Sequence, residues 1–115
     1  MDKIQDITKK LLAFRKARDW NQFHNPKDIA LSLVLEAAEV LEHFQWKNKE
    51  EVEKYAKEHK EAIGEELADV FNWILLLSHD LGIDIATAAE KKITKNEKKY
   101  PVEKAKGRHN KYTEL

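Results

Sequence analysis

The chain has 115 residues and carries 21 basic and 21 acidic side chains, so its formal net charge at pH 7 is zero. This balance argues against a general binder of nucleic acid polymers, which is usually basic. The absence of cysteine excludes disulfides, thiolate metal sites and cysteine catalysis.

Helices account for the whole predicted fold. Glycine and proline number only 3 and 2, and no stretch alternates long enough to form a strand, so we expect an all-α protein. Four or five helices are predicted, because segments 49–59 and 60–81 follow one another directly or after a kink. The other predicted helices cover about residues 2–18, 26–44 and 85–100.

Capping residues support these boundaries. Asn25 precedes Pro26, a combination typical of a helix start, and Asn48 and Asp84 can cap the helices that follow them. Gly82 is suited to end the long helix. The apolar stripe of the first helix is predicted to comprise Ile4, Ile7, Leu11, Phe14 and Arg18.

The length fits one domain over residues 1–115, with segment 102–115 as an extended polar tail. The N-terminus lacks the apolar region of a signal peptide, and no apolar run approaches the roughly 18 residues that span a bilayer. We therefore expect a cytoplasmic protein with no membrane contact.

The most informative residues are two acidic pairs on predicted helices. Glu66 and Asp69 are spaced i, i+3 on a helix that is apolar nearly all round, and Glu36 and Glu39 repeat this spacing on an earlier helix. Carboxylates in an apolar setting require protonation, basic partners or a metal ion. If the helices pack together, the oxygen ligands favour Mg²⁺, with Mn²⁺ as an alternative.

Two other interpretations of these acids remain open. Acidic pairs commonly line solvated helix faces, and Glu66 and Asp69 could instead pair with lysines across a bundle or an oligomer interface. A di-iron site is disfavoured, because His43 and His79 have the wrong offsets from the glutamates.

The acidic pairs occur together with further motifs, which read RDWNQFH over residues 18–24, EVLEHFQW over 39–46, NEKKYP over 96–101 and KYTEL over 111–115. In this combination the chain resembles the MazG-like nucleotide pyrophosphohydrolases, in particular their dCTP pyrophosphatase branch. The resemblance covers nearly the whole chain in one register. It implies an oligomeric MazG-like bundle, with a tetramer favoured over a dimer.

The resemblance also implies an activity, namely Mg²⁺-dependent hydrolysis of a nucleoside triphosphate, with dCTP as the leading substrate, to the monophosphate and pyrophosphate. Such enzymes clean nucleotide pools. By the family pattern the metal ligands and catalytic acids would be Glu36, Glu39, Glu66 and Asp69. The residues that would hold the nucleoside are Trp20, Asn21, Gln22, Phe23, His24, Trp46 and Trp73, and those that would hold the triphosphate are Lys92, Asn96 and Lys99.

The residue types suit these roles. Trp20 and Phe23 lie in a helix-breaking segment where a base could stack on them. His24 could hydrogen-bond the base or the sugar, although a lone histidine is more often a surface or capping group. Either Glu39 or Glu66 could act as general base. Plain core packing is the alternative for Trp46 and Trp73.

Two positions depart from the animal dCTP pyrophosphatases. Leu11 stands where those enzymes have a histidine, and Trp73 stands where they have a tyrosine. Both positions lie near the nucleoside, so the reaction type is better supported than the preference for cytosine. The competing hypotheses are the same fold acting on another (modified) nucleotide, a nucleotide-binding or assembly protein without turnover, and a purely structural bundle.

Overall fold

The computed structural model describes residues 2–115, and all regular structure within them is helical. The elements are α1 (Lys3–Ala17), η1 (Asn21–Phe23), α2 (Pro26–Glu42), α3 (Lys49–Glu58), α4 (Lys60–Asp80), α5 (Ile85–Lys99), α6 (Val102–Ala105) and η2 (Tyr112–Glu114), where η marks a 3₁₀ turn. The all-α prediction is confirmed, and each of the five predicted helices is present.

The predicted helix count is short by one, because six α-helices occur in the described residues. Segment 102–115, which we expected to be extended, contains α6 and the turn η2. Pro101 ends α5, but its carbonyl oxygen accepts the N–H of Ala105 at 2.9 Å and so opens a new helical turn.

The predicted caps explain why the helices begin where they do. The Asn25 side chain accepts the N–H of Asp28 at 3.0 Å, and Pro26 follows at the first helical position. Asn48 and Asp84 form equivalent bonds at the starts of α3 and α5. Each such cap stabilises its helix by about 1 kcal/mol.

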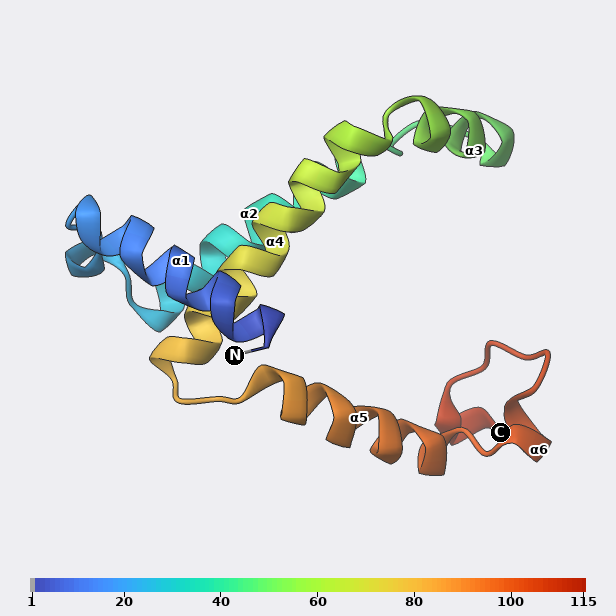
Figure 1. Ribbon diagram of the computed structural model, residues 1–115. Helices are drawn as coiled ribbons and strands as arrows, with labels where there is room; N and C mark the ends of the chain where they lie inside the picture. The colour runs from blue at the N-terminus through green and yellow to red at the C-terminus, as the bar shows by residue number, and fades with distance from the viewer. Residues whose placement is uncertain (1) are drawn as a thin grey trace. The chain divides into compact units, whose positions relative to one another are not determined.

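The chain forms two compact units, which divide at Gly82 and Ile83. In the first unit α2 and α4 lie side by side, and α1 and α3 also pack against α4 (Figure 1). The second unit contains α5, α6 and η2. Within it the rings of Tyr100 and Tyr112 meet edge to face at 6.1 Å.

The core of the first unit is small. Ile29, Leu75 and Leu76 are its buried apolar side chains. The apolar composition of α4 predicted a helix that is buried on all sides. This prediction is wrong, because Leu67 is 53% exposed and Phe71 is 38% exposed. Within the first unit, the contacts of α1, α2 and α3 with α4 leave these two side chains uncovered. No helix among residues 2–115 has the length and apolar character required to cross a bilayer.

The predicted stripe of α1 needs one correction. Arg18 is exposed, whereas Arg15 is buried. Beyond α1 the chain turns at Asp19, which has a left-handed φ of 53°, and the N–H of Trp20 donates to the carbonyl of Arg15 at 3.1 Å. This turn begins the connection from α1 to α2.

Candidate active site

Three of the four predicted acids converge in the first unit. Glu36 and Glu39 lie on α2 and Glu66 lies on α4, and each offers a carboxylate oxygen within 4.8 Å of the others. The i, i+3 spacing places the two α2 acids on one face, and the packing of α2 against α4 brings the third beside them. The cluster consists of oxygen donors only, a set that suits a hard divalent cation.

Glu36 is the member whose environment most requires a cation. Its Oε2 atom is buried and lacks a hydrogen-bond partner among the described residues. Burial raises the pKa of Glu36, and Glu39, Asp69 and Glu66 raise it further. A bound cation would satisfy the buried oxygen and neutralise the repulsion, so these residues fit a metal site.

Asp69, the fourth predicted acid, lies at the edge of this cluster. It is exposed, but its charge raises the pKa values of both Glu36 and Glu66. It also lines the same cavity as Glu36. The apolar sequence around Glu66 and Asp69 predicted that these two carboxylates would be the desolvated ones. In the described residues the buried carboxylate oxygen without a hydrogen-bond partner belongs to Glu36 instead.

The site also contains His43, whose position in the sequence indicated only that it is an unsuitable iron ligand. Its Nδ1 lies 2.8 Å from the Tyr55 hydroxyl, and its Nε2 lies 3.7 Å from Oε1 of Glu66. The ring therefore lies between Tyr55 of α3 and Glu66 of the acidic cluster. Spacing within the sequence gives no sign of this contact, because Tyr55 belongs to a different helix.

A cavity of about 520 Å³ opens beside the acids. Its aromatic walls include Phe14, Trp20 and Trp73, while Glu36 and Asp69 contribute acidic groups and Lys10 and Arg15 contribute basic groups. The remaining lining residues are Ile7, Leu11, His24, Asn72 and Leu76. The cavity can therefore accept a flat ring. Its basic groups can face an anionic ligand, and its acidic groups can face a metal ion bound to that ligand.

The structure brings three of the predicted nucleoside residues to this cavity, namely Trp20, His24 and Trp73. Asn21 lies instead at a neighbouring cavity of about 500 Å³, which His24 also lines. The Gln22 amide donates to the Asp19 side chain at 3.0 Å. Phe23 and Trp46 lie in solvent, with exposed fractions of 64% and 92%.

The predicted triphosphate residues belong to the second unit. Lys92, Asn96 and Lys99 occur on α5, where their spacing places them on one helix face. Lys99 also contacts the Tyr112 ring, with its Nζ 4.8 Å from the ring centre.

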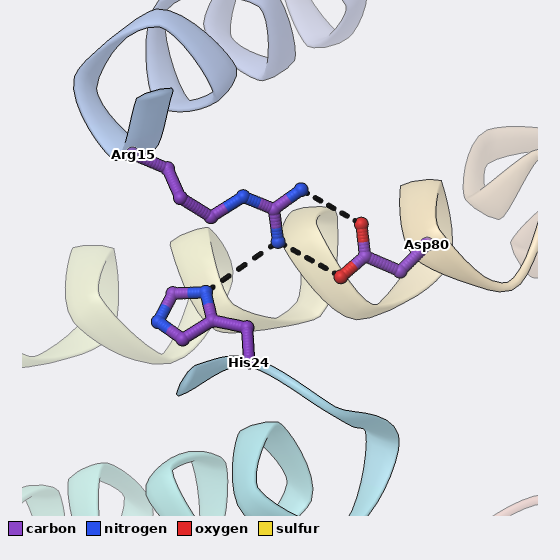
Figure 2. Close-up of polar contacts among 3 residues, drawn as sticks. All are labelled: Arg15, His24 and Asp80. Atoms are coloured by element: carbon purple, nitrogen blue, oxygen red, sulfur yellow. Dashed lines mark hydrogen bonds and ion pairs between the residues drawn. The ribbon is translucent and has the colours of Figure 1, made fainter. Parts of the chain in front are cut away.

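The structure also contains a part-buried ion pair that we did not predict from the sequence. Arg15 of α1 donates to both carboxylate oxygens of Asp80 on α4, each at 2.8 Å (Figure 2). A sequence signal existed, because each charge continues an apolar row: Arg15 follows Leu11 by four residues and Asp80 follows Leu76 by four.

Fold and site together define an all-α protein in which a carboxylate cluster adjoins an aromatic cavity. Residues 31–115 match the MazG-like family. The chain is 38% identical to rat dCTP pyrophosphatase 1 and 35% identical to the human protein of that name, over 97% of this chain and 67% of each relative. The chain also resembles the crystal structure of a pyrophosphatase from Archaeoglobus fulgidus, with a TM-score of 0.84 and 35% identity over 88% of this chain and 94% of that one.

The chain belongs to the MazG-like family. The family resemblance inferred from the sequence motifs is thereby confirmed.

Proposed function

We propose that this protein hydrolyses dCTP to dCMP and pyrophosphate in a Mg²⁺-dependent reaction. The chain is a nucleotide pyrophosphohydrolase, as its family and its relatives indicate. The observation that carries the proposal is the position of Glu36, which joins the acidic cluster to a cavity walled by Trp20 and Trp73. A nucleoside in this cavity would lie next to the metal-binding acids.

The acidic cluster is the proposed metal site. Glu36, Glu39, Glu66 and Asp69 would hold Mg²⁺, with Mn²⁺ as a possible substitute. When bound, such an ion neutralises the charge that develops on phosphoryl oxygens and positions the reactants.

The proposed chemistry is an in-line attack on the α-phosphorus. A water oxygen forms the new P–O bond, the bond to the α–β bridging oxygen breaks, and pyrophosphate leaves with that oxygen. Either Glu39 or Glu66 would accept the proton of the attacking water. Glu39 is exposed, and Glu66 lies 3.7 Å from Nε2 of His43.

The proposed nucleoside site extends beyond the three predicted residues at the cavity to the rest of the segment 20–24 and to Trp46. Trp46 has a φ of 67°, a strained conformation for a bulky residue, and its ring is almost fully exposed. Strain of this kind is often maintained at ligand sites. Lys92, Asn96 and Lys99 would hold the triphosphate.

The experiment is pyrophosphate release from a panel of nucleoside triphosphates, with Mg²⁺ and with EDTA. We expect release from dCTP with Mg²⁺, a slower reaction with the other nucleotides, and none with EDTA. Release from a different nucleotide would retain the reaction and shift attention to Leu11 and Trp73. Binding of dCTP without release of pyrophosphate would instead identify a nucleotide-binding protein. The absence of both binding and release would contradict the proposal.

We further propose that the protein acts as a homotetramer in the cytoplasm, on the free nucleotide pool. The exposed apolar side chains of α2 and α4 support self-association, since exposed apolar patches commonly mark contacts between proteins. They include Leu31, Val34, Leu35, Leu41, Leu67 and Phe71.

Light scattering of the purified protein is expected to give four times the 13.5 kDa chain mass. Replacing Leu67 by Glu should lower this mass, because a charge would be buried at the subunit contact. Replacing the exposed Glu53 by Gln on α3 should leave the mass unchanged. A monomeric wild type would contradict the tetramer.

A further inference from the structure

Arg15 contacts His24 as well as Asp80. Its Nη1 atom lies 3.4 Å from Nδ1 of the imidazole, while Nη1 and Nη2 hold the Asp80 carboxylate at 2.8 Å (Figure 2). Arg15 is 6% exposed, so water does not compete strongly for these contacts. Arg15 belongs to α1, His24 to the segment before α2, and Asp80 to α4.

This geometry restricts the protonation of His24. A guanidinium has only N–H donors, so the nitrogen that faces it must supply a lone pair. A hydrogen bond from Arg15 requires an unprotonated Nδ1, which places the proton of the neutral ring on Nε2. A doubly protonated ring would bring two donors and two positive charges face to face.

The surroundings of the ring favour the same state. Burial lowers the pKa of His24 and the charge of Arg15 lowers it further, while Asp80 opposes this effect. The other close ring belongs to Trp73 of α4, which meets the imidazole edge to face at 5.4 Å and carries no charge. In Figure 2, Nε2 lies on the side of the ring opposite Arg15.

We propose that Arg15, held by Asp80, is a positioning residue that keeps His24 neutral and its Nε2–H available as a hydrogen-bond donor to the nucleoside. This inference rests on the proposed function, because it requires a nucleoside in the cavity that His24 lines. The acceptor would be an oxygen or nitrogen of the base or an oxygen of the sugar. Arg15 thereby acts on substrate binding through His24.

The first test is ¹⁵N NMR of the histidine side chains in the full chain. We expect His24 in the wild type to show the Nε2–H tautomer and to titrate below the ordinary imidazole value of about 6.5. In the double variant Arg15→Met, Asp80→Leu, both tautomers should appear and the midpoint should rise. Two apolar side chains replace the ion pair together, so neither charge is left buried alone.

The second test is a mutant cycle on turnover of dCTP. The double variant should raise KM about fivefold and change kcat less than twofold, the effect of weakening one hydrogen bond to the substrate. In a His24→Gln background the side-chain amide supplies an N–H donor that does not depend on a tautomer. Arg15→Met and Asp80→Leu together should therefore shift KM less than twofold in this background. Lys27→Met, which removes an exposed ion pair with Asp28, is the control.

A wild-type His24 that carries its proton on Nδ1, or that titrates at or above about 6.5, would overturn the positioning role. An equal rise of KM in both backgrounds would do the same, because it would indicate a general structural effect. The NMR result requires only the folded chain. Failure of the proposed function would therefore appear as absent turnover with the spectrum unaffected.

Discussion

Replacing Glu36 by Gln is expected to lower kcat at least about a hundredfold in saturating Mg²⁺. The amide has nearly the same size but cannot supply a charged oxygen to the cation. Glu36 holds the buried, unpartnered oxygen of the cluster, so its loss should affect metal binding more than the loss of an exposed acid. Steady-state turnover of dCTP measures the effect.

The same substitution should stabilise the metal-free protein. Burial raises the pKa of Glu36, and Glu39, Asp69 and Glu66 raise it further, which means that the ionised form is unfavourable in the folded chain. The neutral amide removes this repulsion, so Tm in EDTA should rise while the increase of Tm on adding Mg²⁺ should shrink. Glu42→Gln, an exposed change on the same helix, is the matched control and should alter neither quantity.

Full activity in Glu36→Gln would remove Glu36 from the proposed metal site. A lower Tm in EDTA would show that the side chain stabilises the fold through contacts other than a cation. Because activity and Tm are expected to change in opposite directions, misfolding cannot imitate the predicted result.

Replacing Asp80 by Asn is expected to reduce the free energy of unfolding by about 2–3 kcal/mol at neutral pH. Removing one partner of a fully buried pair costs about 3–5 kcal/mol, and the 24% exposure of the Asp80 side chain reduces that figure. The substitution leaves the Arg15 guanidinium buried without its counter-charge. Chemical denaturation at fixed protein concentration measures the change, since self-association would otherwise shift the apparent stability.

The pH dependence of this difference has a defined sign. Arg15 holds the pKa of Asp80 below its ordinary value, so the folded state favours the ionised carboxylate. The stabilisation is fully present above the ordinary carboxyl pKa and is lost as the pH falls through the lower folded value. The wild type and Asp80→Asn should therefore converge in acid, below about pH 4.

Two comparisons isolate the ion pair. Lys27→Met, which removes an exposed pair, should change the unfolding free energy by less than about 0.5 kcal/mol. The double variant Arg15→Met, Asp80→Leu should be more stable than Asp80→Asn, because no buried charge remains. Equal stability of the wild type and Asp80→Asn at neutral pH would contradict the predicted effect.

Local chemistry made much of the fold predictable. Asn25 with Pro26, Asn48 and Asp84 begin helices because their side chains accept backbone N–H groups that would otherwise lack partners. These signals lie within a few residues of the boundaries that they set. The acidic pairs were visible for the same reason, since the i, i+3 spacing is a property of a single helix.

The degree of burial was harder to predict. The sequence marked Glu66 and Asp69 as the acids in apolar surroundings, but the buried carboxylate oxygen that lacks a hydrogen-bond partner among residues 2–115 belongs to Glu36. The exposure of Leu67 and Phe71 was also unexpected. Burial depends on which neighbouring elements cover a side chain, and helical periodicity describes only one element at a time.

By itself the sequence determined an all-α chain with capped helices, two acidic pairs and an aromatic segment between the first two long helices. The tertiary structure alone decided that Arg15 meets Asp80 and His24, and that His43 joins Tyr55 to Glu66. The Arg15–Asp80 contact spans 65 positions of the chain. Periodicity identifies the residues that share a helix face, whereas packing between helices determines which of those faces meet.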